Sequence, residues 1–387
     1  MRSIIQLLQC STLKNMHSTD ERIAAGMQWL KRAHDATIDG GVAIRYSLLR
    51  GWEASYPETT GYIIPTFLRY FDITGETEYR DRAIIMGEWE LSIQEKDGSF
   101  FGGYLNSGVG KLVFDTGQIL FGLINIFELT GDEKYLSAAK RAGDWLIEIQ
   151  DDDGAWRNFS YHSIPHAYHA RVAWPLAELA RVTSDTKYAN GAKRHFDWVL
   201  TNCTSDGWFD NAGFTKENNN SPYTHTIAYT LRGLLEGGLL LKADEYIDAV
   251  YKSMGFVLMQ MDKSGRFCGS YNRKWEGDRK YSCLTGNAQF SIICSKLYML
   301  SHEPIYFEAA KSINAYLETK QNMSTNNDDI KGAIPGSSPI WGEYERMSCP
   351  NWATKFYIDA LWAASESSKA GSNRTNIREL LSFKYPG

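Results

Sequence analysis

The sequence predicts an all-α protein folded as a single (α/α)6 toroid, which is a ring of six helical hairpins. Three observations indicate this fold: an internal repeat, two alternating families of helices, and long loops that gather on one side of the ring. Self-similarity at a fixed period of several tens of residues is typical of repeat architectures. We expect residues 1–20 to form an N-terminal extension, 21–368 the toroid and 369–387 a C-terminal tail.

The repeat is marked by a short polar turn that ends in tyrosine, as at residues 74–79 and 130–135. Successive marker tyrosines lie 56, 53, 58 and 60 residues apart, at Tyr79, Tyr135, Tyr188, Tyr246 and Tyr306. Each marker opens an amphipathic pattern, which predicts a helix on the outside of the ring. Glycine follows each pattern, and it ends a helix readily because it accepts the left-handed conformation.

A second helix family fills the other half of each unit. Its members are apolar nearly all round, as at residues 119–124, and this predicts helices buried on every side. We expect six of them, beginning near residues 57, 114, 165, 222, 283 and 349, with an early outer helix at 21–39 as the partner of the first hairpin. Parallel inner helices open their N-termini on one face, where the long loops also lie, so functional residues are expected there.

Composition excludes several functional classes. The chain of 387 residues carries a net charge of −5, whereas nucleic-acid binders usually present a basic face. No stretch approaches the roughly 20 apolar residues of a membrane helix. We expect a cytoplasmic protein, with a periplasmic or lipid-anchored form (a lipoprotein signal ending at Cys10) as the alternative. The six cysteines lack zinc-site spacing, which predicts reduced thiols, no metal and no cofactor; the oligomeric state is left open.

Trp145, Gln150, Gly154 and Trp156 follow a helix rich in small residues and resemble the repeat of the prenyltransferase and squalene-cyclase toroids. The resemblance covers five units and implies the toroid fold. The functional pattern of those families is absent. Their acid motif has no counterpart at the mouth, because Asp151-Asp152-Asp153 lies at the end of an outer helix, far from the mouth. Isoprenoid chemistry is therefore not expected.

Residues 56–62, 166–171 and 350–353 resemble segments of bacterial proteins associated with exopolysaccharide or O-antigen synthesis. The layout of residues 21–368 is also similar to (α/α)6 carbohydrate enzymes, among them unsaturated glucuronyl hydrolases, N-acylglucosamine 2-epimerases, glucuronyl C5-epimerase and several polysaccharide lyases. This resemblance implies a poly- or oligosaccharide substrate. A shared fold does not by itself define the reaction.

Two carboxylates, Glu58 and Asp115, lie at the openings of consecutive inner helices. Neighbouring helices pack about 10 Å apart, so these side chains can face each other across a sugar. Glycoside hydrolysis needs such a pair, one as acid and one as base or nucleophile. The structural alternative is that both cap their helices, since Asp is a preferred N-cap residue. Glu343, before the last inner helix, is a third candidate and is assigned to substrate binding.

Histidine and tyrosine gather at the same openings. His166, Tyr168, His169 and Arg171 crowd one helix start, and His225 opens the next inner helix. Histidine titrates near neutrality and is the usual proton carrier, so Tyr168, His169 and His225 are candidate catalytic residues. Each histidine alone is more often a satisfied structural group, and only their clustering favours a site.

Further aromatic, basic and amide side chains complete the predicted rim. Trp and Tyr faces suit stacking on sugars, and Arg or Lys can hold an anionic substituent. Core packing is the alternative for the aromatic residues. The candidate substrate-binding residues are Arg45, Trp52, Tyr56, Arg171, Tyr229, Asn287, Asn351, Trp352 and Lys355, and the polar loop at 320–340 is a candidate lid.

Three functions fit these residues. The first is hydrolysis of a glycosidic bond in a bacterial polysaccharide by the Glu58 and Asp115 pair. The second is a uronate lyase or a sugar epimerase, in which Tyr168 or Tyr229 and a histidine move a proton. The third is a non-catalytic toroid that binds glycans or serves as a scaffold in polysaccharide synthesis.

Overall fold

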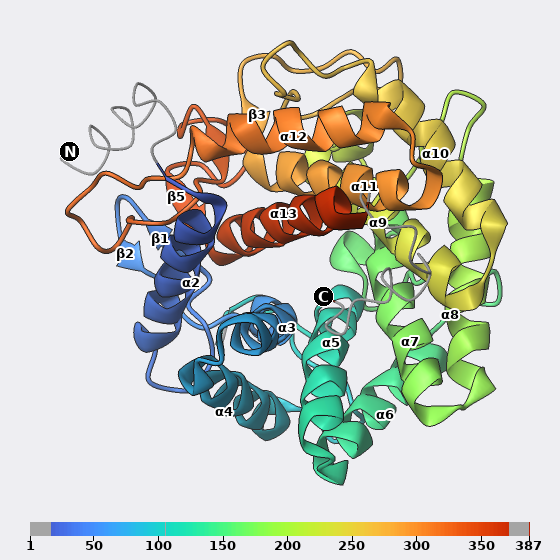
Figure 1. Cartoon of the computed structure of the whole chain (residues 1–387). Coiled ribbons are helices and arrows are strands. Elements are labelled where there is room, and N and C mark those ends of the chain that lie inside the picture. Colours follow the sequence, from blue (N-terminus) through green and yellow to red (C-terminus); the bar gives the residue numbers. More distant parts are fainter. Residues whose placement is uncertain (1–16, 105, 371–386) are drawn as a thin grey trace.

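The computed structural model describes residues 17–104, 106–370 and 387, and the described chain forms the predicted (α/α)6 toroid (Figure 1). Six inner helices pack side by side in chain order, and the last contacts the first, which closes the ring. The inner helices are α3 (Pro57–Thr74), α5 (Val113–Thr130), α7 (Ala170–Thr183), α9 (Thr224–Leu241), α11 (Leu284–Ser301) and α13 (Asn351–Ala370). The outer helices are α2 (Thr19–Asp35), α4 (Thr77–Ile93), α6 (Glu133–Glu148), α8 (Thr186–Thr201), α10 (Asp244–Leu258) and α12 (Pro304–Glu318).

Each hairpin runs from an inner helix to an outer helix through a tight turn with one left-handed residue. That residue is Gly75, Gly131, Ser184, Lys242 or His302 in turn. The return from outer to inner helix is long and lies at the inner N-termini. As a result α2, which was expected to pair with the first hairpin, packs instead against α13 and completes the sixth pair.

The glycine that ends an outer helix also docks that helix on the next one. Gly154 has a φ of +89°, and a Cβ there would collide with the main-chain oxygen of Arg194 in α8. Beside it Gln150 Nε2 donates to Gly154 O at 2.9 Å and to Gly191 O at 3.0 Å. Gln94 and Gln321 likewise each donate from Nε2 to two main-chain oxygens, one in the loop that follows and one in a neighbouring outer helix. This packing is the physical basis of the sequence repeat.

The marker tyrosines join successive outer helices through their hydroxyl groups. Tyr188 donates its hydroxyl hydrogen to Asp144 of the preceding outer helix at 2.9 Å, and Tyr246 donates to Asp197 at 2.6 Å. Tyr135 makes the equivalent bond to Glu88. The ring is thus held by one set of polar bonds outside and by apolar packing between inner helices inside.

The small strands lie among the long loops. Strand β1 (Arg45–Ser47) pairs antiparallel with β2 (Gly51–Trp52) and β5 (Ser348–Pro350), and β3 (Ser282–Cys283) pairs with β4 (Ser337–Ser338). Pairing of β1 with β5 ties the loop before α3 to the loop before α13, and so closes the ring at its mouth.

The segment after α12 departs from the expected lid. Trp29 Nε1 of α2 donates to Asp329 O at 2.8 Å, and Gly332 packs on the main chain of Ala25. Residues 320–332 therefore belong to the wall of the ring. None of the helices in residues 17–104 and 106–370 is long and apolar enough to cross a bilayer. Cys10 and most of the expected extension and tail lie outside the described residues, and the five described cysteines are free thiols.

Candidate active site

Glu58 and Asp115 lie one turn or less into α3 and α5, with exposed fractions of 8% and 2%. Neither residue caps its helix, since Tyr56 and Leu112 hold the N-cap positions. The Tyr56 hydroxyl donates to Glu58 Oε2, and the N–H of Gly103 donates to Asp115 Oδ1 at 3.1 Å. The structure thus brings the two predicted carboxylates together beside one phenol.

Burial dominates the electrostatics of this pair. It raises the pKa of Glu58 to about 7, against the downward pull of the Tyr56 hydrogen bond and of Arg171. Burial also raises the pKa of Asp115 well above its usual value, and the nearby charge of Glu58 adds to that increase. Two buried carboxyl groups whose charges interact retain a proton that isolated carboxyl groups would lose, and they titrate as a pair.

His169 and Tyr168 form an aromatic wall next to the carboxylates. The His169 ring stacks on Phe114, which precedes Asp115 in the chain, with 6.0 Å between ring centroids. Neither His169 nitrogen has a hydrogen-bond partner among the described residues, and burial lowers the pKa of this histidine well below its usual value. Tyr168 packs edge-on against Phe114 at 5.3 Å. At neutral pH the His169 imidazole is therefore neutral and the Tyr168 phenol is protonated, and both lie near the carboxylates.

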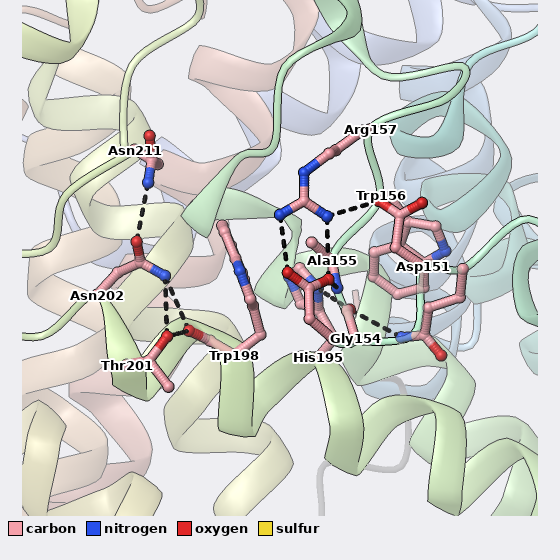
Figure 2. A network of polar contacts seen from close by, with 12 residues as sticks. Asp151, Gly154, Ala155, Trp156, Arg157, His195, Trp198, Thr201, Asn202 and Asn211 are labelled. Atoms are coloured by element: carbon pink, nitrogen blue, oxygen red, sulfur yellow. Dashed lines mark hydrogen bonds and ion pairs between the residues drawn. The ribbon is translucent and has the colours of Figure 1, made fainter.

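A network of polar contacts around Trp156 lies behind this wall (Figure 2). His195 Nδ1 contacts Gly154 O at 2.9 Å, and its ring lies 4.5 Å from that of Trp156. Trp156 in turn contacts the His169 ring at 6.2 Å. Arg157 holds the same loop by ion pairs with Asp151 and Asp153. The run of aspartates that ends α6 therefore supports a loop and lies outside the carboxylate site.

His166 has a structural environment. Its Nδ1 and Nε2 each lie 2.9 Å from a main-chain oxygen, of Gly213 and Tyr161 respectively. These contacts connect two long loops behind η3 (Ala167–His169). His166 therefore has a structural role, with both ring nitrogens engaged by the main chain.

His225, near the start of α9, is oriented by a neighbouring inner helix. Gln289 Nε2 of α11 lies 2.9 Å from His225 Nδ1, and this hydrogen bond orients the imidazole. The ring lies 4.1 Å from Tyr229 and 5.3 Å from Tyr344. Burial lowers its pKa well below the usual value, and the charge of Arg171 adds to this effect.

Arg171 was expected at the mouth, with His166, Tyr168 and His169. Its guanidinium group lies instead among the side chains of the inner helices. Its Nε donates to Gln118 Oε1 at 3.1 Å, while Nη1 and Nη2 have no partner among the described residues. The guanidinium is enclosed by five aromatic rings, with Tyr229 nearest at 4.7 Å. These rings belong to Tyr62, Phe121, Trp174, Tyr229 and Phe356.

The loop before α13 covers part of the mouth. Tyr344 packs on Tyr223 and His225, and its hydroxyl accepts a hydrogen bond from Trp352 Nε1 at 2.9 Å. Trp352 also contacts the Tyr56 ring edge-on at 6.5 Å. Glu343 beside it is exposed. The segment around Tyr344 thus covers this part of the mouth. The prediction of a lid at residues 320–340 is wrong for residues 320–332, which belong to the wall of the ring.

Several predicted substrate-binding residues have protein partners instead. Arg45 forms ion pairs with Glu53 and Glu345, and the Trp52 ring packs on Trp29 over α2. These contacts give both residues a structural part in the rim, and their assignment to substrate binding stays a prediction.

The amide and lysine candidates also have partners within the chain, and their assignment to substrate binding stays a prediction. Asn287 bonds to Phe267, Ser282 and Cys283, and Asn351 Nδ2 bonds to Ala43 and Thr59. Lys355 pairs with Asp359 at 2.7 Å below the mouth. Their polar groups hold the loops and the helices in place.

Three residues of the site were not singled out from the sequence, namely Phe114, Trp156 and Tyr344, whereas Gln289 was expected on the rim. Phe114 precedes Asp115 directly, and Trp156 belongs to the repeat, so both had a signal in the sequence. Tyr344 reaches the site from a loop far along the chain, and only the closed ring places it there.

Comparisons with known proteins agree with this fold. Residues 52–233 match the family model of the squalene-hopene cyclase C-terminal domain. No curated protein sequence matches the chain significantly. Among solved structures, an unsaturated glucuronyl hydrolase specific for heparin is similar with a TM-score of 0.70 and 16% identity, covering 91% of this chain and 98% of that one.

Two further structures extend the comparison. Cellobiose 2-epimerase from Bacillus thermoamylovorans B4167 gives a TM-score of 0.71 at 11% identity, covering 93% of this chain and 98% of that one. An unsaturated glucuronyl hydrolase from Bacillus sp. GL1, described as responsible for the degradation of glycosaminoglycan, gives a TM-score of 0.69 at 14% identity. The match covers 89% of this chain and 96% of that one. At such identities the likeness establishes the fold alone. The chain is an (α/α)6 toroid similar in layout to both hydrolases and epimerases.

Proposed function

We propose that the protein is a carbohydrate-active enzyme that hydrolyses a glycosidic bond in a polysaccharide or oligosaccharide. The observation that carries this proposal is the buried pair of Glu58 and Asp115, joined by Tyr56 at the starts of neighbouring inner helices. A buried pair that retains one proton supplies both an acid and a base at neutral pH.

The roles within the pair follow from their surroundings. Tyr56 donates to Glu58, and Arg171 also favours its charged form, so Glu58 is the base or nucleophile. The pKa of Asp115 is raised further by the charge of Glu58, so Asp115 holds the proton and acts as general acid. Tyr168 lies near the pair and the Trp352 ring contacts Tyr56, so we propose these two aromatic rings for stacking on a sugar.

Epimerisation or lyase chemistry is the second candidate, and one observation favours it. His169 and His225 are buried neutral imidazoles near Tyr168 and Tyr229, which suits proton transfer at a sugar carbon. The similarity to a cellobiose 2-epimerase is consistent with this reading. A non-catalytic glycan-binding toroid is the third candidate.

Product analysis tests the three candidates. The purified protein is incubated with cellobiose, with saturated and unsaturated uronate disaccharides, and with bacterial exopolysaccharide fragments, and products are identified by NMR and mass spectrometry. Hydrolysis adds one water per bond broken, and a lyase creates the ultraviolet absorbance of an unsaturated uronate without adding water. An epimerase leaves the mass unchanged. Addition of water supports the proposal, whereas either of the other product patterns, or binding without turnover, contradicts it.

A further inference from the structure

Aromatic side chains lead outwards from the carboxylate pair to the surface of the mouth. The first is Tyr168, which packs edge-on against Phe114 beside Asp115. The Tyr168 ring also contacts Phe214, with 5.5 Å between centroids, and Phe214 contacts Tyr161 at 6.3 Å. Tyr168, Phe214 and Tyr161 therefore form a continuous aromatic track across the loops before α7 and α9.

Exposure increases along the aromatic track. Tyr168 is 2% exposed, Phe214 is partly buried and Tyr161 is 47% exposed. Within the described ranges, the aromatic side chains with exposed fractions of 45 to 50% all lie on loops that lead into inner helices, and they are Phe101, Tyr104, Phe159, Tyr161 and Trp341. Exposed apolar groups that gather on one face of a protein mark an interaction site.

The two loops that carry the outer rings are held together from behind. His166 Nδ1 lies 2.9 Å from Gly213 O, and Nε2 lies 2.9 Å from Tyr161 O. Because Gly213 precedes Phe214, one buried histidine fixes the main chain at both outer rings. The N–H of Phe214 also donates to Asn218 Oδ1 at 2.9 Å. The two rings are thus positioned in advance, which lowers the entropic cost of binding a ligand.

The backbone on both sides of Tyr161 is strained. Phe159, His162 and Ser163 have φ angles of 58°, 57° and 53°, in the left-handed region that residues other than glycine rarely adopt. Such strain persists only where the surroundings impose it, and it concentrates at functional sites. Here it accompanies two aromatic rings that remain about half exposed, Phe159 at 45% and Tyr161 at 47%.

The surroundings of Tyr161 suit a sugar. Asn158, His162 and Ser163 lie close to it in the chain and are exposed. An aromatic ring attracts the C–H face of a pyranose, and polar side chains beside it can bind the hydroxyl groups. An apolar protein partner would bury the same polar side chains without hydrogen bonds, which is destabilising. The aromatic track therefore fits a glycan better than a protein surface.

We propose that Phe214 and Tyr161 form a distal subsite for a glycan chain, so that the protein recognises oligosaccharides of several sugar residues. One sugar residue lies at Tyr168 near the carboxylate pair, and the chain leaves the mouth over Phe214 and Tyr161. This inference rests on the proposed function in that the ligand is a glycan, and it adds the length of the chain and the residues that bind its outer part.

Calorimetry with glycans of graded length tests the aromatic track. Oligosaccharides of cellulose, hyaluronan and alginate, each with two, four or eight sugar residues, are titrated into the full-length Glu58→Gln protein, in which the proposed turnover is blocked. We expect the eight-residue form of at least one glycan to bind at least about tenfold more tightly than its disaccharide. Tyr161→Ala and Phe214→Ala, in the same background, should weaken eight-residue binding by about five- to tenfold and leave disaccharide binding unchanged.

Two variants serve as controls. Tyr161→Phe keeps the ring and should retain the affinity for the eight-residue glycan. Ile305→Ala removes an apolar side chain that is 58% exposed at the start of α12, on the face opposite the mouth, and should also retain it. If Phe214→Ala does not fold, the exposed Tyr161→Ala decides. Sedimentation compares the oligomeric state of Tyr161→Ala with that of the unmodified protein, because a second copy of the chain is the alternative occupant.

Four results would overturn the proposal: no binding of any of the glycans, equal affinity for two and eight residues, unchanged eight-residue affinity in Tyr161→Ala, or a change of oligomeric state in that variant in place of a change in affinity. Its failure is distinguishable from failure of the proposed function. Hydrolysis of disaccharides without a preference for long chains contradicts the distal subsite alone. Tighter binding of long chains that depends on Tyr161, without any hydrolysis by the unmodified protein, contradicts the proposed hydrolysis alone.

Discussion

The Tyr56 hydroxyl donates a hydrogen bond to Glu58 Oε2, two residues along the chain, and it also lowers the pKa of Asp115 on the neighbouring inner helix. Tyr56 takes this position because it is the extended N-cap residue of α3, with a φ of −124° and a ψ of 111°. A single phenol therefore links the two carboxyl groups on which the proposed chemistry depends.

Tyr56→Phe should shift the pH dependence of turnover. Loss of the hydrogen bond removes a contact that favours ionised Glu58, so the pKa of Glu58 rises and the acid limb of the kcat/KM profile moves to higher pH. At neutral pH we expect a decrease of about 10- to 100-fold, in line with the value of a hydrogen bond to a charged group. Tyr104→Phe, at an exposed loop residue, is the control and should leave the profile in place.

Glu58→Gln should stabilise the protein at high pH. The folded-state pKa of Glu58 is about 7, above its ordinary value of 4.5, so the stabilising contribution of the protonated carboxyl is complete below pH 4.5 and is lost as the pH rises through 7. At pH 8 the variant should be more stable by on the order of 1–3 kcal/mol, and at pH 4.5 it should match the unmodified protein. Chemical denaturation at both pH values measures this, and an equal effect at both would contradict it.

His169→Phe should reduce the sensitivity of the fold to acid. The pKa of His169 is far below its ordinary value of 6.5, so below pH 6.5 the unfolded chain binds a proton at this residue that the native chain does not. Stability is therefore lost as the pH falls. Phenylalanine should lower the slope of unfolding free energy against pH by up to about 1.4 kcal/mol per unit below pH 6.5. Since neither nitrogen has a hydrogen bond among the described residues, stability at pH 7.5 should change little. An unchanged acid slope would count against the buried neutral state.

Gly154→Ala should destabilise the ring strongly. The added Cβ would collide with the main chain of Arg194, and the residue needs a φ of +89°. We expect a loss of about 2–4 kcal/mol in urea unfolding. The control is Gly255→Ala in α10, where a Cβ meets open space, and this change should stabilise by about 0.5–1 kcal/mol. Similar losses for both variants would contradict the packing described for the repeat.

The sequence was sufficient for the ring but only for part of the site. Residues equivalent to Tyr135, Gln150 and Gly154 occur in successive repeat units because each contacts a neighbouring outer helix. Such contacts leave a periodic signal in the sequence. Glu58 and Asp115 were predictable because helix starts on one face of a toroid converge.

The environment of the other candidates could not be read from their helix positions. Arg171 begins α7 yet reaches the centre of the ring, and Asn287 and Asn351 are satisfied by loops that no periodicity describes. The pairing of α2 with α13 depends on how the ring closes. Tyr344 arrives from a loop more than two hundred residues away from Asp115, and nothing in its local sequence fixes where it lies.

The most direct test of the central claim is the steady-state turnover of Glu58→Gln and Asp115→Asn, measured on the first glycan that the unmodified protein cleaves. Glycan binding and circular dichroism serve as the checks on folding. If the pair supplies acid and base, each variant loses at least about a hundredfold in kcat while binding the glycan with similar affinity. Unimpaired turnover in either folded variant would contradict the account.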